Sequence, residues 1–332
     1  MRLMEQARFE FGIKPLYSTR FGSAYVGDSL ELMRELPDSS VNLILTSPPY
    51  ALHFKKEYGN KNQSEYVNWF VPFAKEFLRI LRDDGSFVLD IGGSWQPGRP
   101  TRSLYHFELL LTLCKEVGFS LAQECFWYNP AKLPAPAEWV TVRKIRIKDA
   151  VECLWWLSKT AHPKANNRNV LNPYSEDMKR LIKRGYKPKL RPSGHNITHK
   201  FGNGNGGGSI PPNLLICGNN DSNGRYLEAC KRAGLKPHPA RFPIQLPTFF
   251  LRFLTEPGDL VFDPFAGSNT TGEACEREKR RWLASEIEKS YLEASRFRFG
   301  QEMSPIELTS NGKREDNSSK QQELFLFEGI SP

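Results

Sequence analysis

A short apolar run that stops at two prolines constrains the fold of this chain more than any other feature. Residues 41–45 read Val-Asn-Leu-Ile-Leu, which is typical of a buried strand. Thr46-Ser47-Pro48-Pro49 follows directly. Because a proline fixes φ and lacks an N–H group, neither Pro48 nor Pro49 can continue a central strand. The sequence therefore predicts a stiff loop at the carboxyl end of a buried strand, where open α/β sheets bind ligands.

The groups on this loop suit a planar amino group. Ser47 offers a hydroxyl, Pro48 a backbone carbonyl and Tyr50 an aromatic face. Two acceptors can take both N–H groups of an exocyclic NH2, while the tyrosine stacks on the ring that carries it. A plain proline turn after a strand is the alternative interpretation, and the tetrapeptide alone does not separate the two.

Strands and helices alternate on both sides of an interruption. Strands are expected at residues 23–28, 41–45, 86–91, 119–128, 150–158, 260–262 and 282–286, and helices at 29–36, 66–81, 107–117, 246–254, from 274 onward and at 291–299. Residues 83–85 are expected to end the helical unit before them. The pattern predicts an α/β fold, a Rossmann-like parallel sheet with helices on both faces.

The alternation fails between residues 159 and 235, which we interpret as an inserted, loop-rich module. The net charge of +9 is concentrated nearby, since residues 141–200 hold 15 Lys and Arg against 4 Asp and Glu, and the remainder 31 against 33. A basic block on a balanced chain favours a polyanionic partner, with a solvated charged surface as the alternative.

Other features limit the classes of protein to which this chain can belong. No apolar run approaches the ~20 residues of a membrane span, and residues 1–6 lack the apolar core of a signal peptide. Six scattered cysteines without a C-x-x-C pair indicate reduced thiols, so we expect a cytoplasmic protein without a metal site. The tail from 304 to 332 is polar and expected to be disordered.

A second ligand site is predicted at residues 263–272, where a strand, a glycine-containing turn and a helix follow one another. The helix N-terminus offers free N–H groups, and Glu286 ends the next strand at the distance typical of a ribose-binding carboxylate. Thr270 and Thr271 stand where a phosphate-binding loop would have a lysine. A nucleoside cofactor with an amino-acid tail therefore fits better than NAD or ATP, with a tight βα turn as the alternative.

Together, residues 46–50 and 263–268 resemble the catalytic and S-adenosylmethionine (SAM) motifs of DNA amino-methyltransferases. The catalytic motif comes first, as in the permuted β class, and its serine is typical of enzymes that methylate N4 of cytosine. The likeness to the PvuII-type methylases extends over residues 12–299, with further signposts at 56–60, 143–146, 191–195, 209–214 and 238–243. Asn269 replaces the usual glycine, and asparagine tolerates the left-handed backbone that such a turn needs.

The resemblance implies roles for individual residues on a cytosine flipped out of the duplex. Ser47 and the Pro48 carbonyl, in the motif with Pro49, would accept the two N4 hydrogens and bias the nitrogen towards a tetrahedral geometry. Tyr50 would stack on the base, with Trp127 or Tyr128 as a second wall unless these pack in the core. The cofactor-binding residues would be Asp28, Phe242, Pro243, Asp263, Phe265, Gly267, Asn269, Thr270 and Glu286, with Glu286 on the ribose.

The resemblance also implies an organisation and a partner. Residues 12–158 would form the catalytic half, 159–235 the target-recognition module and 236–300 the SAM-binding half of the methyltransferase domain. The partner would be double-stranded DNA at a short palindrome, CAGCTG if specificity follows the likeness. Arg143, Lys144 and Arg146 would contact this DNA.

The expected role is protection of the bacterial chromosome from a cognate endonuclease that is separately encoded and not bound, by an enzyme acting as a monomer. Two alternatives stay open. One is an N6-adenine DNA or RNA amino-methyltransferase, and the other is a catalytically silent, sequence-specific DNA-binding protein.

Overall fold

The structure is a computed structural model that describes residues 11–51, 61–185, 192, 194, 206–219 and 223–300. The tail at 304–332 lies outside the described residues, as do residues 56–60, most of 191–195 and part of the basic stretch 141–200. Within the described ranges, no helix is long and apolar enough to cross a membrane.

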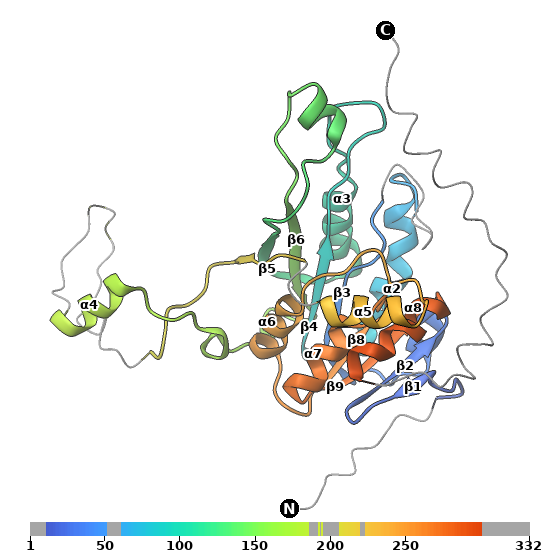
Figure 1. Ribbon diagram of the computed structural model, residues 1–332. Coiled ribbons are helices and arrows are strands. Elements are labelled where there is room, and N and C mark those ends of the chain that lie inside the picture. Colours follow the sequence, from blue (N-terminus) through green and yellow to red (C-terminus); the bar gives the residue numbers. More distant parts are fainter. Residues whose placement is uncertain are drawn as a thin grey trace, which may run out of the picture.

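One nine-stranded sheet organises the chain, in the order β1-β2-β9-β8-β3-β4-β6-β5-β7 (Figure 1). The strands are β1 (Tyr17–Ser18), β2 (Gly22–Val26), β3 (Val41–Thr46), β4 (Leu81–Ile91), β5 (Ser120–Tyr128), β6 (Val151–Ser158), β7 (Leu214–Ile216), β8 (Leu260–Asp263) and β9 (Arg281–Glu286). The predicted α/β fold is confirmed, with β3 near the middle of the sheet.

The predicted parallel sheet is found at the central strands, but the sheet as a whole is mixed. β2, β9, β8, β3 and β4 are parallel neighbours, but β6 runs antiparallel to both β4 and β5, and β1 antiparallel to β2. The reason is the connection between β5 and β6, since residues 129–150 lead back beside the same strand, whereas parallel neighbours need a crossover.

Helices cover both faces of the sheet, as predicted. One face packs against α1 (Ser29–Arg34), α2 (Tyr66–Ile80) and α3 (Tyr105–Thr112), through side chains such as Leu32, Phe70 and Leu109. The other packs against α6 (Gln245–Leu254), α7 (Thr270–Glu278) and α8 (Lys289–Ser295), through Phe250, Ala274 and Leu292. The two apolar layers hold the strand ends in fixed positions.

Several element boundaries differ from the expected ones, notably those of β4, α7 and the last helix. β4 already begins at Leu81, because a register shift opposite Val41 and Leu43 accommodates residues 82–85 within the strand. α7 begins at Thr270 and not at 274, because the Asn269 side chain accepts a hydrogen bond from Gly272 N at 3.0 Å and caps the helix there. The last expected helix ends as a 3-10 turn at Arg296–Phe299.

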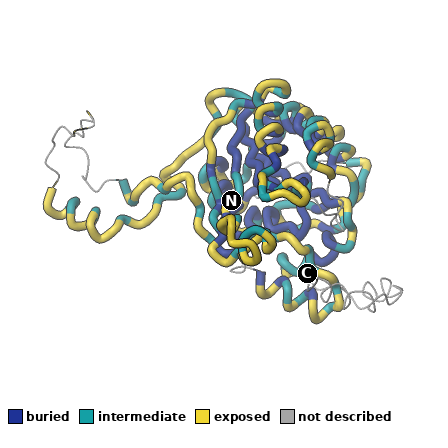
Figure 2. The backbone as a smooth tube through the Cα atoms, turned by 90° about the horizontal axis from the view of Figure 1, so that it is seen from above, coloured by how far each residue is buried: buried dark blue, intermediate teal, exposed yellow. Residues whose placement is uncertain are grey.

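The segment 159–235 is partly an arm and partly joined to the body. An exposed arm leaves the body in Figures 1 and 2 and carries α4 (Glu176–Arg184), which Ser175 caps by accepting from Met178 N. Its two limbs are tied by paired backbone hydrogen bonds between Asn172 and Ser209, both 2.9 Å. Beyond the arm, β7 adds to β5, and α5 (Gly224–Arg232) packs against Arg296–Phe299 and α8.

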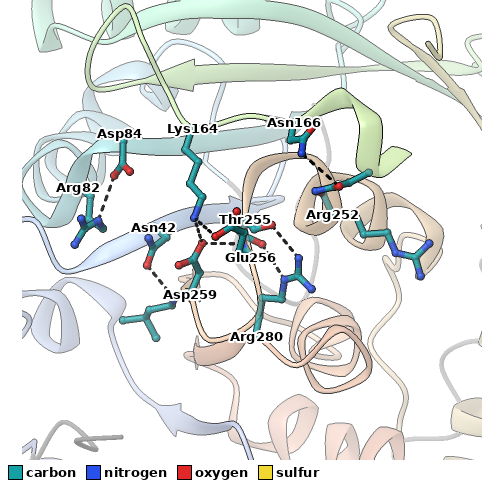
Figure 3. A network of polar contacts seen from close by, with 12 residues as sticks. Asn42, Arg82, Asp84, Lys164, Asn166, Arg252, Thr255, Glu256, Asp259 and Arg280 are labelled. Atoms are coloured by element: carbon teal, nitrogen blue, oxygen red, sulfur yellow. Dashed lines mark hydrogen bonds and ion pairs between the residues drawn. The ribbon is translucent and has the colours of Figure 1, made fainter. Parts of the chain in front are cut away.

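A polar network fastens the first residues of this segment to the sheet at the amino ends of its strands (Figure 3). Lys164 Nζ lies 3.0 Å from Asp259 and 3.2 Å from Glu256, and Asn166 N donates to the Phe253 carbonyl at 2.8 Å. In the same network Asn42 Oδ1 accepts from the N–H of Leu260, which joins β3 to β8. The arm therefore starts from a fixed base.

Gly22→Ala tests the close contact between β2 and β9. A Cβ at Gly22 would overlap the ring and the carbonyl oxygen of Trp282, its partner in the sheet. Such overpacking should lower the free energy of unfolding by about 1–3 kcal/mol in denaturant titrations. Gly224→Ala is the control, because a Cβ there would meet no atom within 4 Å. Equal stability of the two variants would contradict this packing.

Candidate active site

A cavity of about 1280 Å³ lies at the carboxyl ends of the central strands. Its wall is formed on one side by residues that follow β2, β3, β8 and β9, and on the other by residues of β5, β6 and the segments 131–135 and 238–242. Pockets for one small ligand measure about 300–1,000 Å³, so this cavity has room for two ligands side by side.

The structure brings most of the predicted site residues into this one cavity. The lining includes Asp28, Ser47, Pro48, Pro49, Tyr50, Trp127, Phe242, Phe265, Gly267, Thr270 and Glu286. Asp263 and Asn269 lie buried behind the wall, while Tyr128 and Pro243 lie next to residues of the lining. The two predicted ligand sites, at residues 46–50 and 263–272, are therefore two half-sites of one cavity.

A buried hydrogen bond joins the half-sites. β3 and β8 are parallel neighbours, with Leu43 opposite Val261 and Ile44 opposite Phe262. Their ends therefore lie side by side, and Thr46 Oγ1 donates to Asp263 Oδ1 at 2.7 Å.

The same aspartate also organises the turn after β8. Asp263 accepts from Thr271 Oγ1 at 2.6 Å and from Phe265 N at 3.2 Å. Burial raises the pKa of Asp263 to about 6, against the opposing effect of these hydrogen bonds. One buried carboxyl thus fixes the loop after β3, the turn after β8 and the start of α7.

The turn from Gly267 to Asn269 is the one for which the sequence predicted a nucleoside site. Both residues adopt left-handed backbone, with φ of 51° and 55°. Gly267 N donates to Glu286 Oε2 at 2.8 Å, and Glu286 Oε1 accepts from Glu288 N at 2.9 Å. These bonds hold the Glu286 carboxylate at the cavity wall, where its remaining lone pairs can accept from ligand hydroxyl groups.

Arg298 supports this turn from behind, and sequence reasoning missed it. Its side chain, 1 % exposed, donates to the Ser268 carbonyl at 2.6 Å and Ser268 Oγ at 2.9 Å, and pairs with Glu273 at 2.8 Å. The guanidinium also lies 4.5 Å from the centroid of the Tyr226 ring in α5. Arg298 is expected in a helix by sequence, and no local pattern marks it as a partner of a turn 30 residues earlier.

Aromatic side chains line the cavity between the half-sites. Trp69 and Phe73 of α2 lie 5.8 and 5.1 Å from the Phe265 ring, measured between centroids. Trp127 is 5 % exposed, and its Nε1 donates to the Cys217 carbonyl at 2.8 Å, which fixes the indole. Such faces suit flat rings and a cationic ligand group.

The loop after β3 is fixed by polar contacts with β6. Tyr50 OH lies 3.4 Å from Ser47 Oγ and donates to Glu152 Oε2 at 2.6 Å. Lys132 Nζ pairs with the other oxygen of Glu152 at 2.6 Å. A Cβ at Gly92 would come within 2.5 Å of the Tyr50 ring, so the glycine leaves the space in which this ring lies.

Asp90 is a second carboxyl in this half of the cavity, and sequence reasoning did not single it out. It lies in β4, is 2 % exposed, and its Oδ1 has no hydrogen-bond partner among the described residues. Burial and then the Glu152 carboxylate raise its pKa, while the Ser47 and Tyr50 hydroxyls oppose the shift. The available signal was a carboxyl in the apolar run of residues 87–91 at the end of β4.

The predicted DNA-contacting residues lie outside the cavity, on the exposed loop between β5 and β6. Arg143 pairs with Glu138 at 2.6 Å and covers the Trp139 ring at 5.1 Å, and Arg146 donates to the Pro100 carbonyl. Lys144, also exposed, has a left-handed backbone with φ of 57°. Their charges face solvent beyond the cavity.

Comparison with known proteins decides the family. A DNA methylase family model matches residues 41–297. The chain belongs to the DNA methylase family. The family predicted from the motifs is thereby confirmed.

This DNA methylase is 56 % identical over 292 residues to the type II methyltransferase M.PvuII of Proteus hauseri, covering 87 % of each chain. It is 26 % identical over 276 residues to M.BglII of Bacillus subtilis, which covers 81 % of this chain and 66 % of that protein. The solved PvuII DNA methyltransferase, described as cytosine-N4-specific, superposes with a TM-score of 0.74 and 48 % identity over 91 % of this chain and 94 % of its own. A putative DNA modification methylase of Thermus thermophilus, solved with S-adenosyl-L-methionine, shares the fold at a TM-score of 0.50 and 21 % identity, over 82 % of this chain and 92 % of its own.

Asp263→Asn should reveal the buried carboxyl through the pH dependence of stability. A folded-state pKa of about 6 lies above the ordinary value of 3.8, so the protonated form stabilises the fold, and this contribution is lost as the pH rises through 6. Between pH 5 and 7.5 the wild type should lose about 1.4 kcal/mol of unfolding free energy relative to Asp263→Asn. Denaturant titrations at both pH values measure this difference.

Thr271→Val is the matched control for this effect. It removes a hydrogen bond that favours the carboxylate, so its destabilisation should grow between pH 5 and 7.5, opposite in sign to the trend for Asp263→Asn. A difference that does not vary with pH in either variant would contradict the assignment.

Proposed function

We propose that this DNA methylase transfers a methyl group from SAM to the exocyclic N4 of a cytosine flipped out of duplex DNA. The observation that carries the proposal is the single cavity in which the Ser47 loop and the Gly267 turn meet, joined by the bond between Thr46 and Asp263. The serine of the motif and the identity with the cytosine-N4-specific PvuII enzyme support N4 of cytosine over N6 of adenine.

The residues around the Gly267 turn fit SAM. Glu286 would accept from the ribose hydroxyls, Asp28 would lie towards the adenine, and Phe265, Phe242 and Thr270 would line the remaining wall. When bound, SAM supplies a methyl carbon on a cationic sulfur, and transfer breaks the S–C bond as the N–C bond forms. The aromatic and carboxylate lining favours a cation at this place.

On the other side of the cavity, the chain would hold the base and take its proton. Ser47 Oγ and the Pro48 carbonyl would accept the N4 hydrogens and direct the nitrogen lone pair into the cavity, while Tyr50 would stack on the ring. The methylated nitrogen must lose one proton. Asp90 is the carboxyl suited to receive it through Ser47, because both line this half of the cavity and Asp90 Oδ1 has no hydrogen-bond partner among the described residues.

Two projections of the protein would bind the part of the DNA that lies outside the cavity. The arm bearing α4 and the loop between β5 and β6 both leave the body (Figure 1), and both are rich in Lys and Arg. As target-recognition module within 159–235, the arm would read a short palindrome, and one subunit would act on each strand in turn. The biological role would be protection of the chromosome in the bacterial cytosol from a separately encoded endonuclease.

The proposal is tested by tritium transfer from labelled SAM to unmethylated DNA, followed by identification of the methylated nucleoside by mass spectrometry. Label on N4 of cytosine is expected. Label on N6 of adenine would keep the cofactor and overturn the base assignment. Transfer to RNA alone, or no transfer while SAM and DNA both bind, would support one of the two alternative functions.

Ser47→Ala should reduce turnover about 100-fold or more, by loss of one acceptor for the reacting amino group. The Kd for SAM should stay within about twofold, because Ser47 belongs to the other half of the cavity. Ser40→Ala is the matched control, since Ser40 precedes the same strand at its opposite end and its hydroxyl donates to the Pro37 carbonyl, away from the cavity. Unchanged turnover of Ser47→Ala would remove this serine from the mechanism.

Replacing Arg143, Lys144 and Arg146 together by glutamine should weaken DNA binding and its salt dependence. The slope of log K against log salt should become shallower by about 0.9 for each phosphate that these side chains no longer neutralise. The control is Arg82→Gln with Arg252→Gln, two exposed arginines of the network in Figure 3 at the amino ends of the strands. A wild-type affinity that does not vary with salt would contradict a DNA interface on this loop.

A further inference from the structure

Leu133 places an exposed apolar side chain at the mouth of the cavity. It lies in the segment 131–135 that forms part of the cavity wall, and it is 79 % exposed. Its neighbours Ala131, Lys132 and Ala135 also line the cavity. A leucine so exposed contributes little to the core, and its side chain is therefore available to a ligand that enters the cavity.

The backbone holds this side chain in place. Pro130 and Pro134 restrict the chain on either side. Asn129 Oδ1 accepts from Ala131 N at 3.1 Å, and Lys148 Nζ donates to the carbonyls of Pro130 and Lys132, both at 3.3 Å. The loop is therefore stiffened from several directions although it is exposed.

The same loop is fastened to the half of the cavity that carries Ser47. Lys132 Nζ pairs with Glu152, and Glu152 accepts from Tyr50 OH, both at 2.6 Å. A continuous chain of polar contacts thus fixes Leu133 relative to the ring of Tyr50. A ligand that places one ring against Tyr50 therefore lies in the cavity whose wall Leu133 helps to form.

We propose that Leu133 enters the base stack of the duplex and fills the gap that the flipped cytosine leaves. This inference rests on the proposed function. A flipped base leaves an apolar gap between its neighbours, and leucine is among the side chains that insert between base steps. Because polar contacts fix the loop relative to Tyr50, the distance between Leu133 and the pocket beside Tyr50 stays constant. With Leu133 in the gap, the cytosine could not return to the stack and would stay in the cavity.

The test compares Leu133→Ala with the wild type on two duplexes that carry the site methylated by the wild-type enzyme. One is fully paired, and in the other an abasic residue replaces the partner of the target cytosine. On the paired duplex, single-turnover methylation by Leu133→Ala should be slower by about tenfold or more, because unpairing and unstacking the base is costly. On the abasic duplex, where no pair is broken, its rate should return to within about threefold of the wild type.

Ile147→Ala is the matched control, since Ile147 lies on the same connection, is 90 % exposed and is an apolar residue of similar size. Its rate should match the wild type on both duplexes. The fluorescence of 2-aminopurine beside the target should rise on binding of the wild type and less on binding of Leu133→Ala.

The possible results are distinguishable. An equal loss for Leu133→Ala on both duplexes, or no loss on either, would overturn the insertion of Leu133 while wild-type activity upholds the proposed function. A wild type that methylates no duplex DNA would overturn the proposed function and this inference together.

Discussion

The hydrogen bond between Thr46 and Asp263 is the contact on which the geometry of the site depends. Two residues 217 positions apart meet because β3 and β8 are neighbours in the sheet, and their meeting brings the Ser47 loop against the Gly267 turn. A carboxyl buried this deeply is costly unless its oxygens are hydrogen-bonded, and Thr46, Thr271 and the Phe265 N–H satisfy that requirement. The group therefore stabilises three segments at once, and only in this one arrangement.

The alternation of elements and the position of both motifs at strand ends could be predicted from the sequence, because each depends on local patterns. Pro48 and Pro49 end a strand wherever it lies, and Asn269 can begin a helix from its own side chain. The antiparallel placement of β5 and β6 could not be read in this way. It depends on which edge of the sheet the chain returns to after residues 129–150, and no short pattern encodes that choice.

The difference between local patterns and long-range contacts also explains which site residues were predicted and which were missed. Ser47, Tyr50 and Glu286 belong to motifs that are continuous in sequence. Glu152 and Arg298 act on groups that are distant along the chain, since Glu152 binds a tyrosine 102 positions earlier and Arg298 a turn 30 positions earlier. Their roles arise from packing, because a carboxylate or a guanidinium is informative only once its partner is known.

The paired hydrogen bonds between Asn172 and Ser209 separate the arm from the body. The described part of the arm that carries α4 lies beyond this bridge of paired bonds, while the base of the arm is held by Lys164 and Asn166. Insertions, deletions or replacements beyond the bridge would therefore transmit little strain to the sheet or the cavity. In such an architecture the segment beyond the bridge can be replaced in evolution without rebuilding the sheet or the cavity.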